Sequence, residues 1–163
     1  MKYFIITFGC QTNKADSERM AASLEKKGYK KASEIIGANL IVVNMCSVRQ
    51  SAVDRVYGLI SKFKQLKANP PAGGPNVKTI LTGCILRSDR KKFAEKFDLI
   101  VDKEKYLNCP PKYQRNFPSY VPISNGCNNF CAYCVVPFVR GALVCRNHKE
   151  ILKEVKNTVK NGF

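Results

Sequence analysis

Three cysteines that lie close together are the residues of this 163-residue chain best suited to bind a metal. Cys127, Cys131 and Cys134, the loop cysteines, follow the pattern Cys-x-x-x-Cys-x-x-Cys directly after a predicted strand, YVPIS. Three thiolates can hold three corners of a cubane iron–sulfur cluster and leave the fourth iron open to another ligand. Zinc sites usually present two pairs of ligands, and the only histidine, His148, lies well beyond the loop cysteines. The spacing therefore favours an open iron–sulfur cluster over zinc.

A second set of three cysteines, the edge cysteines, is spread along the chain. Cys10, Cys46 and Cys84 stand in TFGC, VVNMC and LTGC, each at the C-terminal end of a predicted strand. In a parallel sheet these ends lie along one edge, where ligands usually bind. The alternative is that all three are ordinary core residues, because buried cysteine is common. Their repeated position at strand ends favours a second three-thiolate cluster.

Five further residues lie near these motifs, and three of them allow two interpretations each. Cys109 and Cys145 match neither set and are expected to remain thiols. The ring of Tyr133, inside the cysteine loop, could stack on the base of a bound cofactor or pack beneath a cluster. Arg140 and Arg146 could contact phosphate or carboxylate, with an ordinary solvated position as the alternative. Residue type alone leaves these roles open.

Alternating strand-like and helix-like segments position the edge cysteines. Apolar, β-rich runs predict strands at KYFIITF, NLIVVN, VKTILTG and DLIVD. Between them, the pattern predicts a helix capped by Asn13 or Asp16 and stopped at Gly28, a helix over residues 50–66, and a short basic helix at RSDRKKFAEKF. Strands that alternate with helices imply right-handed crossovers and a doubly wound, mainly parallel sheet. Residues 1–104 are therefore expected to form an α/β domain.

A proline-rich stretch separates this domain from the loop cysteines. Residues 105–119, KYLNCPPKYQRNFPS, show little periodicity and are predicted to be a linker. Residues 120–163 then predict one strand, the cysteine loop and one helix. Asn147 and Glu150 predict a capping box at the start of that helix, and Gly162 predicts its end. A unit with a single strand is too small to build a core of its own.

The charge of the chain favours a polyanionic partner. Lys and Arg number 28 against 12 Asp and Glu, which gives a formal net charge of +16. Dispersed cationic side chains attract phosphates, so RNA or DNA is the favoured partner, with charge-based solubility as the alternative. The sequence shows no signal peptide and no membrane-length apolar segment. Eight cysteines in a chain without a secretion signal are therefore expected to serve metal or redox chemistry in the cytoplasm.

The cysteine motifs together resemble those of the radical S-adenosylmethionine methylthiotransferases. TFGCQTNKADSE, VVNMCSVRQSAVDRVYG, ILTGC and ISNGCNNFCAYCVVPFVRG fall in the order of that family across the whole chain. Within the family, NMCSVRQSA is most similar to the tRNA branch that modifies an isopentenylated adenosine beside the anticodon. The alternatives left open are a branch acting on a ribosomal protein or on threonylcarbamoyl-adenosine tRNA, and a non-enzymatic metal-binding module that docks on RNA.

The resemblance implies two 4Fe-4S clusters and S-adenosylmethionine as cofactors. The loop cysteines would hold the cluster that binds S-adenosylmethionine and reduces it to a deoxyadenosyl radical, with Tyr133 near the cofactor's adenine. The edge cysteines would hold the auxiliary cluster that carries the sulfur, and a second S-adenosylmethionine would supply the methyl group. The implied partners are tRNA, a reducing electron donor and a sulfur source.

Two departures from the family pattern bear on these expectations. The chain has Leu143 where the family usually has Glu, and Cys145 where it usually has Ser. Family members also continue through an open (βα) barrel and a small RNA-binding β domain, whereas this sequence stops after the barrel's first βα unit. The expected architecture is thus the α/β domain followed by the first unit of an incomplete barrel. We expect the isolated chain to be catalytically inactive.

Overall fold

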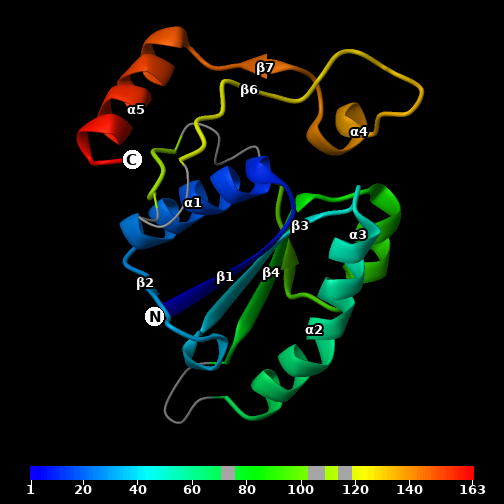
Figure 1. Cartoon of the computed structure of the whole chain (residues 1–163). Helices are drawn as coiled ribbons and strands as arrows, with labels where there is room; N and C mark the ends of the chain where they lie inside the picture. The colour runs from blue at the N-terminus through cyan, green and yellow to red at the C-terminus, as the bar shows by residue number, and fades with distance from the viewer. Residues whose placement is uncertain (71–75, 103–108, 114–118) are drawn as a thin grey trace.

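A five-stranded parallel sheet forms the centre of the molecule (Figure 1). The computed structural model describes residues 1–70, 76–102, 109–113 and 119–163. The strands follow the order β2-β1-β3-β4-β5. Their bounds are β1 (Lys2–Phe8), β2 (Lys30–Lys31), β3 (Leu40–Cys46), β4 (Lys78–Cys84) and β5 (Leu99–Ile100). The four strands predicted for this domain are all present, and the short strand β2 is added at one edge.

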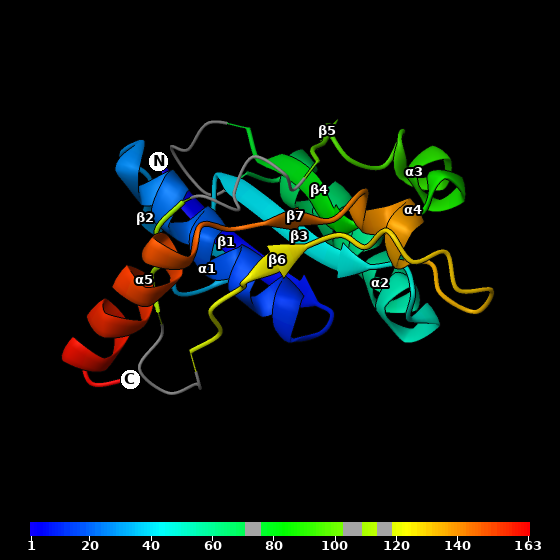
Figure 2. The same cartoon turned by 90° about the horizontal axis from the view of Figure 1, so that it is seen from above.

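Helices cover both faces of the sheet, as the doubly wound prediction requires (Figures 1 and 2). Helix α1 (Gln11–Lys26) lies on one face, while α2 (Gln50–Ala68) and α3 (Arg87–Phe93) lie on the other. A 3-10 turn, η1 (Ile35–Gly37), precedes β3. The direction of winding changes between β1 and β3, which are neighbours in the sheet. Ligands of such folds usually bind at this switch point, outside the carboxyl ends of the strands.

The central strand β3 is buried along its whole length, and its side chains alternate between two apolar layers. Ile41, Val43 and Met45 belong to the larger core, which the apolar sides of α2 and α3 complete. Leu40 and Val42 belong to the smaller core, which is closed by side chains of α1. This two-sided burial explains why the strand reads as a continuous apolar run rather than an alternating one.

The first helix begins earlier than its sequence pattern indicates. Neither Asn13 nor Asp16 is the cap, because α1 starts at Gln11 with Cys10 in the capping position. Asn13 lies inside the first turn, and its side-chain oxygen accepts a hydrogen bond from the Cys10 backbone N–H at 3.2 Å. The predicted end at Gly28 is correct, since this residue has a φ of +85° just beyond the helix.

The C-terminal segment lies across the carboxyl edge of the sheet (Figure 2). It contains β6 (Ser124–Asn125), α4 (Val136–Arg140), β7 (Val144–Cys145) and α5 (His148–Lys160). The strand predicted over residues 120–124 is wrong in extent, because only Ser124 and Asn125 pair, antiparallel to β7. Residue 122 is a proline, which cannot donate to a ladder. Helix α5 begins after Asn147, as predicted, and the Asn147 side chain accepts from the Lys149 N–H at 2.9 Å.

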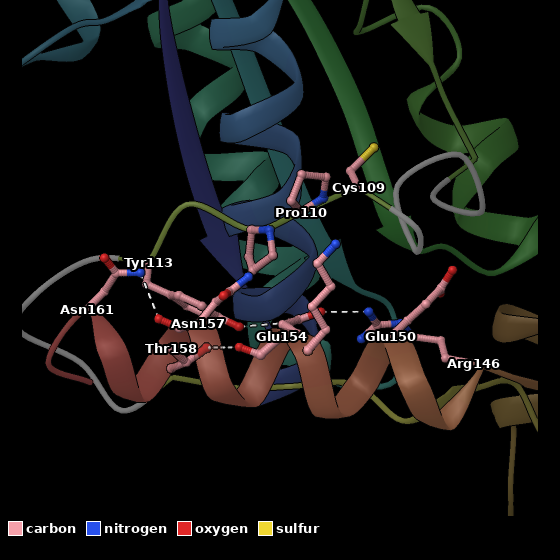
Figure 3. Close-up of a pocket in the computed structure, with 11 residues that line it drawn as sticks. Cys109, Pro110, Tyr113, Arg146, Glu150, Glu154, Asn157, Thr158 and Asn161 are labelled. Carbon is pink, nitrogen blue, oxygen red and sulfur yellow. Dashed lines mark hydrogen bonds and ion pairs between the residues drawn. The ribbon is translucent and has the colours of Figure 1, made fainter.

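A buried ionic cluster, the Glu154 cluster, holds α5 against α1. Glu154 accepts hydrogen bonds from Arg19 at 2.7 Å, from Arg146 at 2.6 Å and from the Tyr113 hydroxyl at 2.8 Å. Figure 3 shows Glu154, Arg146 and Tyr113 along a cavity of about 460 Å³. Burial opposes the charge on Glu154, but the three hydrogen bonds outweigh it and lower the pKa of the carboxyl. The cluster thus joins segments that lie far apart in the chain.

The linker predicted between the α/β domain and the loop cysteines lies partly outside the described residues. In the predicted linker over residues 105–119, residues 105–108 and 114–118 are not described. The described part of the linker, Cys109–Tyr113, contacts α1 and α5: the Cys109 carbonyl accepts from Arg19 at 3.0 Å. No helix in the described residues is long and apolar enough to cross a bilayer.

Substitution of Glu18, which is next to Arg19 on α1, is expected to stabilise the chain by an amount that depends on pH. Burial raises its pKa to about 7, with the Arg19 charge opposing and the Glu154 charge adding to the shift. The ordinary value is 4.5, so the folded state binds the extra proton between these values and loses stability as pH rises through this window. Glu18→Gln should therefore raise the free energy of unfolding by about 2–3 kcal/mol at pH 8 and by under about 1 kcal/mol at pH 5.

Urea unfolding of the reduced chain at both pH values measures this difference. Glu150→Gln, on an exposed position of α5, is the matched control and should leave the two values unchanged. A Glu18→Gln effect that is equal at pH 5 and pH 8 would contradict the raised pKa of Glu18.

Candidate metal centre at the carboxyl edge of the sheet

The edge cysteines converge at one cavity, as the parallel order of the strands predicts. Cys46 and Cys84 end β3 and β4 and are register partners across the two strands. Cys10 follows β1 and caps α1. All three line a cavity of about 400 Å³ at the carboxyl edge of the sheet. The interpretation of these residues as unrelated core cysteines does not account for this shared cavity.

The three edge thiols have different electrostatic surroundings. A hydrogen bond with Cys84, together with burial, raises the pKa of the Cys46 thiol. Burial also opposes ionisation of Cys10, but hydrogen bonds from Asn13 and Thr12 outweigh it and lower the pKa of this thiol. Its place at the N-terminus of α1 also favours the thiolate, because helix N-termini stabilise negative charge. Cys10 is therefore more ready than Cys46 to act as a thiolate.

Two buried asparagines lie beside the edge cysteines, where Asn13 contacts the sulfurs of Cys10 and Cys84. Asn13 and Asn44 are both fully buried, and the Asn13 amide donates to the Asn44 side-chain oxygen at 2.9 Å. The Asn44 amide in turn donates to the Asn13 backbone carbonyl at 2.7 Å. Sequence reasoning missed this pair, although Asn44 interrupts the apolar run of β3. A polar residue at such a position must find a partner, and that requirement is the signal that could have identified it.

Glycine at position 83 allows β4 to pass close to β3 beside the cavity. Gly83 has a φ of +113°, a backbone angle that residues with a side chain rarely adopt. A Cβ atom there would also collide with the backbone carbonyl of Met45 and approach the Asn44 side chain. The backbone just before Cys84 thus depends on a residue without a side chain.

The loop cysteines are carried by a turn that extends over the sheet edge. Gly126, with a φ of +77°, starts the turn. The Cys127 N–H donates to the Gly141 carbonyl at 3.1 Å, and the Cys134 N–H donates to the Cys131 carbonyl at 3.0 Å. Cys131 is exposed, whereas Cys127 and Cys134 are half-buried. The three thiols therefore lie on one loop with an open side.

Exposed aromatic residues lie on this loop and on the neighbouring helix α4. Tyr133 is 91% exposed, and Phe130 and Phe138 are exposed as well, with ring centroids 6.1 Å apart. The Tyr133 ring is thus accessible to a ligand on the loop. Its assignment to cofactor stacking stays a prediction.

Both arginines near the loop are buried and paired with carboxylates, contrary to the solvated alternative. Arg140 of α4 donates to Asp16 at 3.2 Å, and Arg146 donates to Glu154 at 2.6 Å. Arg140 also donates through its Nε to the Cys84 sulfur at 3.0 Å. A buried guanidinium requires such partners, because an unpaired buried charge is costly.

The donor chemistry of the two cysteine sets fits thiolate-held clusters. Each set offers three soft sulfur ligands, and the cavity at the edge cysteines gives one set a shared space. In the protein-only structure, no group of three or more His, Cys, Asp and Glu side chains among the described residues has a geometry that could hold a metal ion. The ligand roles of Cys10, Cys46, Cys84, Cys127, Cys131 and Cys134 therefore stay predictions. Cys109 and Cys145 lie outside both sets, in the described part of the linker and in the exposed strand β7.

Comparison with protein-family models matches residues 2–102 to the description "Uncharacterized protein family UPF0004". This match covers more than half of the chain. The chain belongs to the UPF0004 family. The matched region of UPF0004 contains the whole five-stranded sheet and all three edge cysteines, whereas the loop cysteines lie beyond it.

Curated relatives with a named activity align with nearly the whole of this UPF0004 member. Proteins named tRNA-2-methylthio-N(6)-dimethylallyladenosine synthase from Dictyoglomus thermophilum and Ruegeria pomeroyi are each 32% identical to it. Each alignment covers 99% of this chain and 43% of the relative. The protein of the same name from a Thermoanaerobacter species is also 32% identical, with 99% and 40% covered. The chain thus spans less than half the length of these relatives.

Proposed function

We propose that this chain is the N-terminal portion of a tRNA methylthiotransferase. The proposed enzyme inserts a methylthio group at carbon two of an isopentenylated adenosine next to the anticodon. The observation that carries the proposal is the meeting of the edge cysteines at one cavity, which Asn125, Gly126 and Arg140 at the two ends of the cysteine loop also line. The names of the relatives support tRNA as the substrate and methylthiolation as the reaction.

The two cysteine sets are the proposed ligands of two 4Fe-4S clusters. Cys127, Cys131 and Cys134 would hold a cluster that would supply the electron for cleavage of S-adenosylmethionine, and Cys10, Cys46 and Cys84 would hold one that would supply the inserted sulfur. The chain's own contribution is to orient the ligands: Gly126 starts the loop turn, and the Asn13–Asn44 pair supports the edge cysteines. The exposed Tyr133 ring offers a face on which the adenine of the cofactor can stack.

The partners of the reaction belong to the same proposal. tRNA, an electron donor and a sulfur source are required, and tRNA as the substrate implies the cytoplasm as the compartment. Because the chain spans less than half the length of its relatives, we propose that it is inactive when isolated. Detection of methylthiolated tRNA after incubation with the purified chain and S-adenosylmethionine would contradict this part.

Anaerobic reconstitution should load about eight irons and eight acid-labile sulfides per chain. The triple variant Cys127→Ala, Cys131→Ala, Cys134→Ala should retain about four of each, and so should Cys10→Ala, Cys46→Ala, Cys84→Ala, because each removes the ligands of one cluster. Iron and sulfide analysis, with circular dichroism to verify folding, measures the outcome.

The matched control is the double variant Cys109→Ala, Cys145→Ala, which removes two thiols outside both sets and should leave the iron content unchanged. About one zinc per chain in place of iron would instead indicate a structural metal-binding module. If the unmodified chain and the loop variant both held about four irons, the assignment of the loop cysteines as cluster ligands would be wrong.

A further inference from the structure

The Arg140 side chain lies between the two cysteine sets and contacts both of the elements that carry them. It extends from α4, which follows Cys134 almost directly, toward the carboxyl edge of the sheet. Its Nε donates to the Cys84 sulfur at 3.0 Å, and one terminal nitrogen donates to Asp16 on α1 at 3.2 Å. The other terminal nitrogen donates to the Asn125 side chain at 3.0 Å. The side chain is only 10% exposed.

These contacts fasten both ends of the cysteine loop. Asn125 precedes Gly126 and the first loop cysteine, while Arg140 follows the last one. The Asn125 amide also donates to the Arg140 backbone carbonyl at 3.3 Å, so the two ends are joined directly. A guanidinium is planar and presents its donors in a fixed fork, so three partners at once define its orientation. The loop is thereby held in one position relative to the edge cysteines.

We propose that Arg140 is the positioning residue that couples the two cysteine sites, holding the loop over the sheet edge and donating a hydrogen bond to the sulfur of the edge site. This inference rests on the proposed function for the identity of the group at the edge cysteines. It assigns Arg140 two measurable effects, one on the loop and one on the edge site. The first exists in the chain without any cluster, and the second requires a cluster.

The effect on the loop follows from the lost fork. Arg140→Gln removes the contacts to Cys84 and Asp16 together, so the segment 126–135 should open more readily. Arg140→Lys keeps a positive charge near Asp16 but cannot serve three partners in one plane. The rate at which backbone amide hydrogens of the loop exchange with deuterium should therefore rise in both variants, and more in the glutamine variant.

The effect on the edge site follows from charge and hydrogen bonding at the cluster sulfurs. Reduction makes a cluster more negative, and a nearby cation that donates to a sulfur ligand stabilises the reduced form. Arg140→Gln should therefore lower the reduction potential of the edge cluster. Arg140→Lys should lower it less, because the charge remains while the directed N–H donor is lost.

The experiment uses the full chain in two forms. Hydrogen–deuterium exchange of residues 126–135 is measured on the reduced, metal-free protein. Redox titration followed by electron paramagnetic resonance is measured after reconstitution in the Cys127→Ala, Cys131→Ala, Cys134→Ala background, where only the edge cluster can form. Arg90→Gln, an arginine of α3 that pairs with Asp102, is the control with the same change of charge.

Faster loop exchange and a lower potential in Arg140→Gln, with neither in Arg90→Gln, is the expected result. An edge cluster with unchanged potential and an unchanged loop in Arg140→Gln would overturn the inference and leave the proposed function intact. Failure of any iron–sulfur cluster to form in the unsubstituted protein would overturn the proposed function instead. Unchanged loop exchange in the metal-free Arg140 variants would overturn the positioning role independently of the clusters.

Discussion

Glu154→Ala should lower the free energy of unfolding by about 3–5 kcal/mol, because it leaves two buried cations without their shared partner. The Arg19 side chain is 1% exposed and the Arg146 side chain 6% exposed, so neither can recover its hydration without opening the structure. The substitution also removes the acceptor of the Tyr113 hydroxyl. Urea unfolding of the reduced chain at pH 7, followed by circular dichroism, measures the loss.

The pH dependence of this variant provides an independent check. The pKa of Glu154 is lowered in the folded state, so its contribution is complete above the ordinary value of 4.5 and is lost as pH falls through the folded value. The difference between Glu154→Ala and the unsubstituted chain should therefore shrink in acid. Glu150→Ala, at an exposed position of the same helix, should cost under about 1 kcal/mol. Equal losses for the two variants would show that the Glu154 cluster adds no stability.

Neutralising the lysines of α5 should weaken the salt dependence of tRNA binding. Lys149, Lys153, Lys156 and Lys160 are all exposed and recur at intervals of four, three and four residues, which places them on one helix face. Ile151, Glu154 and Thr158 lie on the opposite face, toward the protein. Phosphates bound by such a stripe release counterions, so affinity should fall steeply as salt rises. Replacing all four lysines by glutamine should reduce the slope of log K against log salt by about 3–4.

Filter binding or fluorescence anisotropy with tRNA over about 50–300 mM salt measures the slope. The Debye length is ~14 Å at the low end of this range and shorter at the high end. The matched control replaces four exposed lysines on β2 and α2: Lys30, Lys31, Lys62 and Lys64. This control carries the same change in net charge. If both quadruple variants lose the same slope, the interaction depends on net charge and not on the α5 stripe.

Local patterns in the sequence were sufficient for most of the α/β domain. The apolar run of β3 predicts a strand buried on both faces because few other structures cover such a run, and Gly28 and Asn147 mark helix ends through their own backbone preferences. The convergence of the edge cysteines was also predictable. Once parallel strands are inferred, their carboxyl ends must share one edge, and only the positions of three cysteines on those ends are needed.

Contacts between distant segments could not be predicted in this way. The extent of β6 depends on β7, an antiparallel partner about twenty residues further along the chain, and a two-residue strand has no periodicity of its own. The start of α1 was misplaced for a related reason: Asn13 has the residue type of a cap, but the tertiary structure uses it inside the helix to contact Asn44.

The amino-acid sequence by itself determined the fold class, the two sets of cysteines and the edge at which one set meets. Only the tertiary structure decided which charges are buried and what they contact. Arg140 and Asp16 are 124 residues apart, and Arg19 and Glu154 are 135 residues apart. A charged side chain is equally suited to solvent or to a buried partner, and the choice depends on whether folding brings a carboxylate within reach.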